Sequence, residues 1–187
     1  MSILIREVLD FSRILHNDVA FERVNLNKII SDIIDDFDLT IKEKNAIIHC
    51  NQLPQIEAIP IQIKQLLNNL IGNSLKFSKK DIPPVITISS EMLPDAAKSN
   101  YKTLIPGIPY CKISIQDNGI GFEQQFADQI FLIFHRLHGR SEFSGTGIGL
   151  ALCKKIVVNH HGEIYAHSTG TDGALFQILL PLSHPAN

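Results

Sequence analysis

Two asparagines and a lysine share one face of a helix predicted over residues 61–77. Asn69, Asn73 and Lys76 are spaced by four and three residues, which places them on the same side of a helix. Asn forms helices poorly, so two of them one turn apart suggest a function beyond solvation. A carboxamide oxygen suits Mg²⁺ that already carries phosphate oxygens and water, and Lys76 can neutralise a phosphate. The alternative is a polar face in contact with water.

A second group follows a predicted apolar strand over residues 110–117. It reads Asp117-Asn-Gly119-Ile-Gly121. A carboxylate at a strand end can accept a hydrogen bond from a ligand amino group, and the two glycines permit close contact with a flat ring. Asn-Gly is also a common turn signal, so a tight turn is the alternative.

A third group, Gly145-Thr146-Gly147-Ile-Gly149-Leu150, opens a helix predicted over residues 147–160. A glycine-rich turn at a helix N-terminus offers backbone N–H groups and the positive end of the helix dipole to an anion. The spacing excludes the dinucleotide fingerprint, because Leu150 stands where that motif needs Gly. It also excludes the P-loop, because no Gly-Lys-Ser/Thr is present.

In this order, the three motifs resemble the ATP-binding superfamily shared by DNA gyrase, heat-shock chaperones, mismatch-repair proteins and histidine kinases. Within it, the chain is similar to the catalytic ATP-binding domain of two-component sensor histidine kinases. Residues 69–78 match the N box, 117–121 the first glycine box, 130–136 the F box and 145–150 the second glycine box. Residues 8–13 look like the end of the dimerisation helix.

The resemblance assigns roles to the first two motifs. Asn73 would coordinate the Mg²⁺ that bridges the ATP phosphates, and Asn69 would face the same phosphates. Lys76 would contact them directly, and Phe77 would lie near the sugar or base. Asp117 would accept a hydrogen bond from the adenine amino group, which disfavours guanine because its carbonyl would leave the carboxylate unpaired.

The resemblance also implies a mobile lid over about residues 122–144, closing over the nucleotide. Phe131 and Phe134 would anchor the lid, and Arg136, with Arg140 as a second candidate, would reach the γ-phosphate. Asn69, Lys76 and Arg136 form the expected catalytic set. The glycines at 119 and 121 would border the base. The glycines at 145, 147 and 149 would contact phosphate and act as a hinge. Thr146 and Leu150 complete the expected binding set.

Two departures from the family pattern concern the site and the substrate. Leu175 stands where the family usually has a hydroxyl residue near the Asp117 network. The phosphoaccepting His of the family lies upstream, on the first dimerisation helix, and His16 follows the signature of the second helix. We therefore expect the acceptor to lie outside this chain. No carboxylate stands near Asn69 to activate water, so we also expect slow hydrolysis.

The remaining histidines support no separate chemistry. His135 and His138 have the spacing of some metal pairs, but no Cys or third His accompanies them, and we expect lid residues without a metal. His160 and His161 end a predicted helix, where imidazolium would suit the dipole.

The order of the predicted helices and strands, which must position these groups, indicates an α+β fold. It is a two-layer α/β sandwich: a mixed, mostly antiparallel sheet of about five strands under three main helices. We expect an extended entry at 21–24 and a long hairpin loop at 93–109. Helices are expected from Asn25 or Asn27 to about Lys44, over 61–77 and over 147–160. Strands are expected at 46–50, 85–89, 110–117, 162–167 and 174–180. Residues 21–187 form the catalytic domain.

Residues 1–20 are expected to be the end of a dimerisation helix and a linker. Leu4, Val8, Phe11 and Leu15 follow heptad spacing over a predicted helix at 2–17. This spacing fits equally a terminal helix packed on its own domain and the end of a longer bundled helix.

Composition limits the other function classes. The 187 residues are 44% hydrophobic with a formal net charge of −2, which fits a globular domain and argues against a nucleic-acid partner. No apolar run approaches the ~18–20 residues of a membrane span, and no signal peptide is recognisable. Three scattered cysteines favour a reduced, cytoplasmic location. Whether the full-length protein is anchored to a membrane stays open.

The expected function is Mg²⁺-dependent ATP binding and transfer of the γ-phosphate to a histidine on the dimerisation domain of the same kinase, upstream of a response regulator. The full-length protein would be a homodimer, whereas this chain alone can be a monomer. Three rivals are a serine kinase of the anti-sigma type, a nucleotide-binding pseudokinase that serves as a scaffold, and a dinucleotide oxidoreductase, which the glycine spacing disfavours.

Overall fold

Five strands form the main sheet of the computed structural model, which describes residues 20–101, 103–137, 143 and 145–184. Their order is β2-β4-β5-β7-β6, with β2 parallel to β4 and the other neighbouring pairs antiparallel. The predicted sheet is therefore confirmed. The bounds are β2 Ile47–Cys50, β4 Val85–Met92, β5 Tyr110–Asp117, β6 Glu163–Ser168 and β7 Ala174–Pro181.

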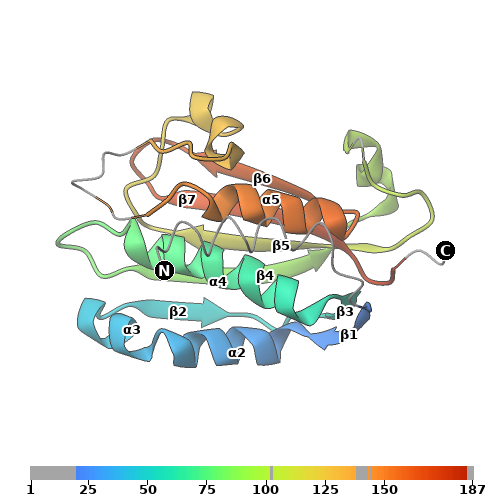
Figure 1. Ribbon diagram of the computed structural model, residues 1–187, viewed down its shortest axis with the longest axis horizontal. Coiled ribbons are helices and arrows are strands. Elements are labelled where there is room, and N and C mark those ends of the chain that lie inside the picture. Colours follow the sequence, from blue (N-terminus) through green and yellow to red (C-terminus); the bar gives the residue numbers. More distant parts are fainter. Residues whose placement is uncertain (1–19, 102, 138–142, 144, 185–187) are drawn as a thin grey trace.

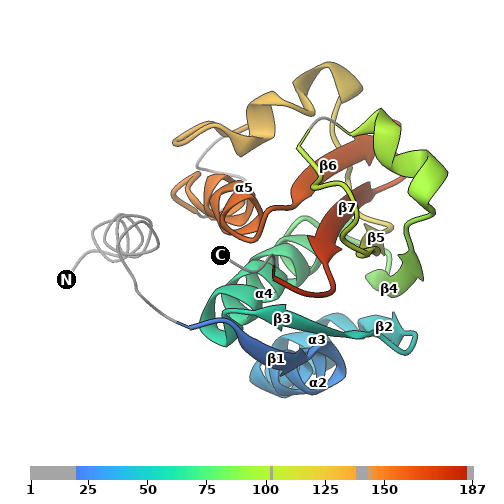
Figure 2. The ribbon, with the colours of Figure 1, turned by 90° about the vertical axis from the view of Figure 1, so that its right-hand side faces the viewer.

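Helices cover one face of this sheet and make the second layer (Figure 1, Figure 2). α4, Pro60–Lys76, and α5, Gly149–Asn159, lie side by side on the sheet, and α2, Leu26–Asp36, packs against α4. The alternation of the strands sends one set of apolar side chains toward these helices. This core includes Leu66 and Leu70 of α4, Ile156 of α5, and Ile88, Ile113, Ile115 and Ile178 of the strands, all at most 1% exposed.

A second, two-stranded sheet joins the start of the domain to the segment before α4. β1, Glu22–Asn25, pairs antiparallel with β3, Gln55–Ala58. The extended entry is confirmed, whereas β3 was not predicted. Its four residues alternate, with Ile56 and Ala58 buried and Gln55 and Glu57 exposed. Two apolar residues are too few to give a period-two signal.

The first predicted helix is interrupted, so the structure describes four helices rather than three main ones. Asn25 caps α2, its side chain accepting from two backbone N–H groups. At Phe37 the backbone leaves helical geometry, and α3 follows over Asp38–Lys44. The Phe37 ring lies against Gly72 of α4, where an added Cβ would be 3.1 Å from it. Packing of this ring against α4 accompanies the break, which hydrophobic spacing did not reveal.

The other boundaries follow local backbone chemistry. Pro60 occupies the first turn of α4 as predicted, where its missing N–H costs nothing. The helix predicted from Gly147 begins at Gly149, because Gly147 has a φ of 79°, outside helical geometry. Short 3₁₀ turns occupy Asp95–Asn100, Gln124–Phe126 and Gln129–Phe131, within segments predicted as irregular.

His160 is the C-cap of α5 as predicted, but its ring is buried and neutral rather than the predicted imidazolium. Its Nε2 accepts a hydrogen bond from the Ile59 N–H at 3.0 Å, which requires the other ring nitrogen to donate to the Ile156 carbonyl at 2.8 Å. Burial is the main reason that the pKa of His160 lies below its ordinary value, and the nearby His184 and His161 lower it further. The neutral ring thus joins the start of α4 to the end of α5.

Some expectations lie outside the described residues: the helix at 2–17 with His16, and His138 and Arg140 of the lid. Among the residues that the structure describes, no helix has the length and apolar character needed to cross a bilayer.

Candidate functional site

A cavity of about 240 Å³ opens where the end of α4, the end of β5, the start of α5, residues 130–137 and Phe143 meet. All the predicted binding and catalytic residues except Gly119 line it. They are Asn69, Asn73, Lys76, Phe77, Asp117, Gly121, Arg136, Gly145, Thr146, Gly147, Gly149 and Leu150, joined by Phe122, Ile130, His135, Leu137, Phe143, Ala174 and Phe176. Residues that lie as far apart in the sequence as Asn69 and Phe176 thus line the same cavity.

Asp117 is the carboxylate among the described residues of the cavity wall, and it is 8% exposed. Its Oδ1 accepts hydrogen bonds from the backbone N–H groups of Gly119 at 2.9 Å and Ala174 at 3.1 Å. Its Oδ2 accepts one from the Ser74 hydroxyl at 2.9 Å. A carboxylate oxygen can accept two donors, so Oδ2 retains capacity for a ligand amino group.

The hydrogen bonds of Asp117 also explain how the site accommodates Leu175, where the family usually has a hydroxyl residue. The backbone N–H of Ala174 and the hydroxyl of Ser74 supply the contacts to Asp117, so no side-chain hydroxyl is needed at position 175. Ser74 is 2% exposed and lies on the buried side of α4, among leucines and isoleucines. A buried hydroxyl needs a hydrogen-bond partner, and this is the signal in the sequence that could have found it.

Gly119 does not line the cavity, contrary to the expectation that it borders the base. Its N–H holds Asp117, and a Cβ added there would lie 2.5 Å from the Phe77 carbonyl oxygen. Gly119 is therefore required for the close packing of the loop after β5 against the end of α4. Gly121, with a φ of 68°, does line the cavity.

The glycine turn before α5 brings positive charge and backbone N–H groups to the cavity wall. α5 begins there without any side-chain hydrogen bond to its N-cap, Ile148, so its first N–H groups can meet an anion. The Lys76 ammonium lies beside the glycine turn, where a Cβ on Gly145 would be 2.8 Å from Nζ. Glycine at 145 thus leaves room for the lysine.

The two asparagines suit a metal that is shared with a phosphorylated ligand. Asn73 is half-buried on the cavity wall, and its side chain makes no hydrogen bond to another described residue. Its oxygen is therefore available as a neutral hard ligand. Asn69 is held by its amide, which donates to the Gly149 carbonyl at 3.4 Å. The donor set fits Mg²⁺ that takes its other ligands from phosphate and water.

Arg136 links the two sides of the lid in this structure. Its guanidinium donates to the carbonyl of Gly145 at 2.6 Å and to the carbonyl of Phe143. Phe143 in turn packs on Phe77, with ring centroids 4.9 Å apart. Reaching a phosphate would require the guanidinium to exchange these carbonyls for the ligand, so its predicted role stays a prediction.

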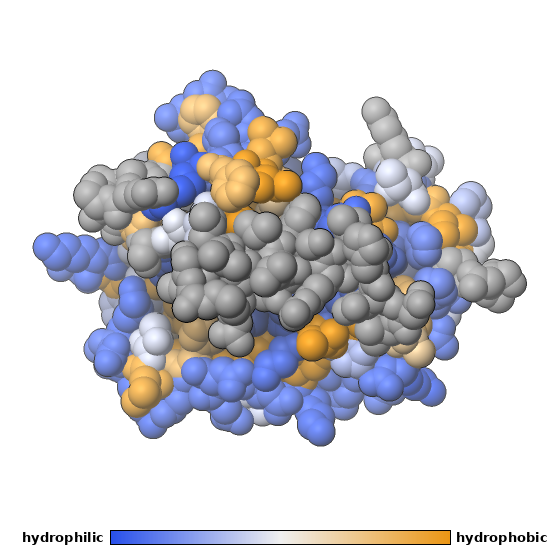
Figure 3. Space-filling view, in the orientation of Figure 1, coloured by the Kyte–Doolittle hydropathy of each residue, from blue (hydrophilic) through white to orange (hydrophobic). Residues whose placement is uncertain are grey.

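The two phenylalanines predicted to anchor the lid, Phe131 and Phe134, differ in burial. Phe131 is 6% exposed and belongs to the core, whereas Phe134 is 59% exposed, so its predicted anchoring role is wrong. With Leu132 and Ile133, it forms a run of exposed apolar side chains in the lid. Figure 3 shows apolar surface on one face of the molecule.

Comparison with protein families identifies the family to which the chain with this cavity belongs. Residues 58–184 match the family described as histidine kinase-, DNA gyrase B- and HSP90-like ATPase. The chain belongs to this ATPase family. The resemblance on which the sequence interpretation rested is thereby confirmed, and ATP use follows from the family.

Relatives by sequence include cyanobacterial phytochromes and a sensor-like histidine kinase. Cyanobacterial phytochrome A of Nostoc sp. is 37% identical over 182 residues, covering 97% of this chain and 22% of the relative. The phytochrome-like protein Cph1 of Synechocystis sp. is 32% identical over 184 residues, covering 98% and 23%. The chain thus spans less than a quarter of the length of these relatives.

Solved structures of histidine kinases share the fold. Full-length ShkA in complex with AMPPNP superposes with a TM-score of 0.74 at 22% identity, covering 98% of this chain and 36% of that one. The catalytic domain of histidine kinase ThkA gives 0.68 at 24% identity, covering 87% and 96%. The fold of this ATPase-family chain is that of a histidine kinase catalytic domain.

Proposed function

We propose that this chain binds Mg-ATP and transfers the γ-phosphate to a histidine of a dimerisation domain in two-component signalling. The observation that carries the proposal is that one cavity holds partners for both an amino group and phosphates. Asp117 keeps an acceptor position open for an amino group. Lys76 and the start of α5, which has no side-chain cap, suit phosphates. An adenine nucleotide carries both groups.

The residues of the cavity favour transfer over hydrolysis. Phosphoryl transfer depends mainly on positioning and charge stabilisation. Lys76 and Arg136 supply positive charge, and bound Mg²⁺, held by Asn73, would neutralise phosphate oxygens. Among the described lining residues Asp117 is the one carboxylate, and its oxygens are held by Ser74, Gly119 and Ala174. No other carboxylate of the described lining is therefore placed to activate water, and we expect transfer to wait for an imidazole nucleophile.

The partners follow from this chemistry. The acceptor histidine would belong to the dimerisation domain of the same kinase, which forms a homodimer, and a response regulator would then receive the phosphate. A complex of ThkA with the response regulator TrrA is among the similar solved structures, which supports this partner class. We place the catalytic domain in residues 21–187 and in the cytoplasm, where ATP is supplied.

Calorimetric titration tests the binding step. The chain is titrated with AMPPNP with and without Mg²⁺, and with the guanine analogue. We expect Mg²⁺-dependent binding that prefers adenine, and loss of the Mg²⁺ dependence in Asn73→Ala. The matched control Asn51→Ala changes an exposed asparagine outside the cavity and should bind normally.

A transfer assay with a complete dimerisation domain then separates kinase from scaffold. Phosphohistidine that forms on that domain supports the proposal. Mg²⁺-dependent binding with no transfer to any acceptor domain would instead favour the pseudokinase alternative, and no binding at millimolar nucleotide would contradict the site itself.

A further inference from the structure

The lid carries a buried polar atom that no described residue satisfies. Among the described residues, Nδ1 of His135 is the buried side-chain nitrogen or oxygen without a hydrogen-bond partner. His135 also lines the cavity between α4, β5 and α5. Native proteins leave few buried polar atoms unpaired, and such an atom in a ligand cavity indicates a contact that the ligand completes.

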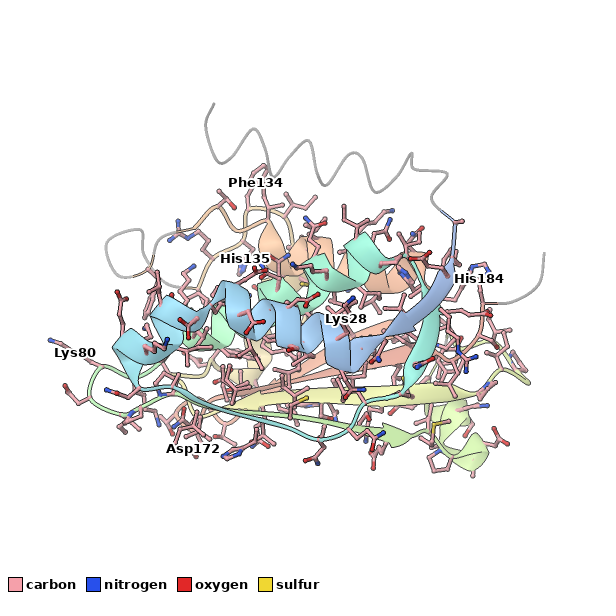
Figure 4. The ribbon with its side chains drawn as sticks, turned by 90° about the horizontal axis from the view of Figure 1, so that it is seen from below. Lys28, Lys80, Phe134, His135, Asp172 and His184 are labelled. Atoms are coloured by element: carbon pink, nitrogen blue, oxygen red, sulfur yellow. The ribbon has the colours of Figure 1, made fainter. Side chains whose placement is uncertain are left out.

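The backbone around His135 holds the ring in this place. Phe134 has a φ of 63°, a left-handed conformation that is unfavourable for a bulky residue and is concentrated at functional sites. The Phe134 N–H donates to the Gly147 carbonyl at 3.0 Å, and the His135 N–H donates to Leu132 at 3.3 Å. Figure 4 shows Phe134 on the outer side of the lid and His135 on the side of α4. The strained turn thus exposes the phenylalanine and directs the imidazole inward.

The surroundings of His135 identify the kind of ligand atom. A Cβ added to Gly147 would lie 3.1 Å from the His135 carbonyl oxygen and 3.1 Å from Arg136 Cγ, so His135 adjoins the glycine turn. Lys76 lies beside the same turn at Gly145, and α5 begins directly after the turn, at Gly149, without a side-chain cap. An imidazole N–H at such a place suits an anionic oxygen.

We propose that His135 binds the nucleotide directly, its Nδ1–H donating a hydrogen bond to a phosphate oxygen. This inference rests on the proposed function, since it names a further contact in the same nucleotide site. It adds a binding residue from the lid that the motifs did not single out.

Titration of His135→Phe and His135→Asn with AMPPNP and with adenosine tests the proposal. Phe keeps a ring but has no N–H, whereas the amide of Asn can place a donor near the position of Nδ1. We expect His135→Phe to weaken AMPPNP binding roughly tenfold, as for loss of a charge-assisted hydrogen bond, and to leave adenosine binding unchanged. His135→Asn should recover most of the affinity.

The control His167→Phe changes an exposed histidine on β6, outside the cavity, and should bind AMPPNP as the wild type does. Thermal unfolding checks the fold: His135→Phe should unfold at or above the wild-type midpoint, because it buries no unpaired nitrogen.

Wild-type AMPPNP affinity in His135→Phe would overturn the inference, as would an equal loss of AMPPNP and adenosine. A wild-type chain that binds neither nucleotide would instead overturn the proposed function, so the two failures are distinguishable.

Discussion

At the scale of single residues, the orientation of Asp117 is fixed before any ligand arrives. Two backbone N–H groups hold Oδ1 and the Ser74 hydroxyl holds Oδ2, so the remaining acceptor position has a defined direction. Groups that are held in place in advance bind with less loss of conformational freedom. Ser74 is therefore a positioning residue for adenine recognition.

The Asp117 network predicts different outcomes for two substitutions. Ser74→Ala should lower the free energy of unfolding by about 1 kcal/mol and weaken adenine nucleotide binding a few-fold, because two of the three hydrogen bonds remain. Asp117→Asn should weaken binding by more than tenfold and reduce the preference over guanine, because an amide cannot accept at both positions. Calorimetry with both analogues checks this, and unchanged selectivity in Asp117→Asn would contradict the assigned role.

His160 predicts a specific dependence of stability on pH. Burial lowers its pKa in the folded chain, so below the ordinary value of about 6.5 the unfolded chain binds more protons. This contribution to stability is fully present above pH 6.5 and is lost as the pH falls toward the lowered pKa. Urea unfolding between pH 7.5 and 5.5 should show the loss, and His160→Gln should reduce the slope. Equal slopes in both proteins would contradict the prediction.

The sequence brought residues to one cavity where a motif marks them and missed those that only the tertiary structure reveals. The roles predicted for the motif residues stay predictions. Asp117 was recognisable because a carboxylate ended an apolar strand. Ser74 was hidden because it sits in an apolar helical face, and His135 because the strained turn that directs it inward has no glycine to mark it. Gly119 was placed at the cavity because spacing cannot distinguish a glycine that contacts a ligand from one that packs on backbone.

At the scale of elements, predictions from periodicity were confirmed for the long segments. α4 and β5 have strong patterns and were found at nearly the predicted bounds. β3 and the break between α2 and α3 depend on pairing and packing with distant residues, which local patterns do not contain. The turns around the cavity are set by particular glycines.

The turn between β6 and β7 offers a matched pair of glycines. Gly173 and Gly170 both have positive φ, 86° and 94°. A Cβ on Gly173 would lie 1.9 Å from the Asp117 carbonyl oxygen, whereas nothing lies within 4 Å of one on Gly170. Gly170→Ala should therefore cost about 1–3 kcal/mol of backbone strain, and Gly173→Ala clearly more, together with nucleotide affinity.

Chemical denaturation and AMPPNP titration of the two variants check this prediction. Equal stabilities, or normal binding by a folded Gly173→Ala, would show that the close approach of this turn to Asp117 does not matter.

At the scale of the whole molecule, the ligand is expected to stabilise the fold because its site joins both layers. The cavity takes residues from the sheet, from two helices and from the lid. With AMPPNP and Mg²⁺ at 100 times the dissociation constant, the free energy of unfolding should rise by about 2.7 kcal/mol. For a chain of this size that corresponds to a midpoint shift of roughly 5–10 °C.

A thermal unfolding series checks the shift, with the guanine analogue and Asp117→Asn as controls. A shift of the same size in either control would mean that stabilisation does not report adenine recognition.

The hydrogen bonds of His160 and Asp117 also bear on the order in which the chain folds. They join residues 101, 43 and 57 positions apart in the sequence. Contacts between such distant positions require large loops to close, and proteins rich in them fold slowly. A partly synthesised chain that ends before β7 lacks the strand that pairs with both β5 and β6, as well as the Ala174 N–H that holds Asp117. Competence to recognise adenine would therefore arise only after β7 has left the ribosome, and a labelled nucleotide would report completed folding of this sheet rather than early collapse.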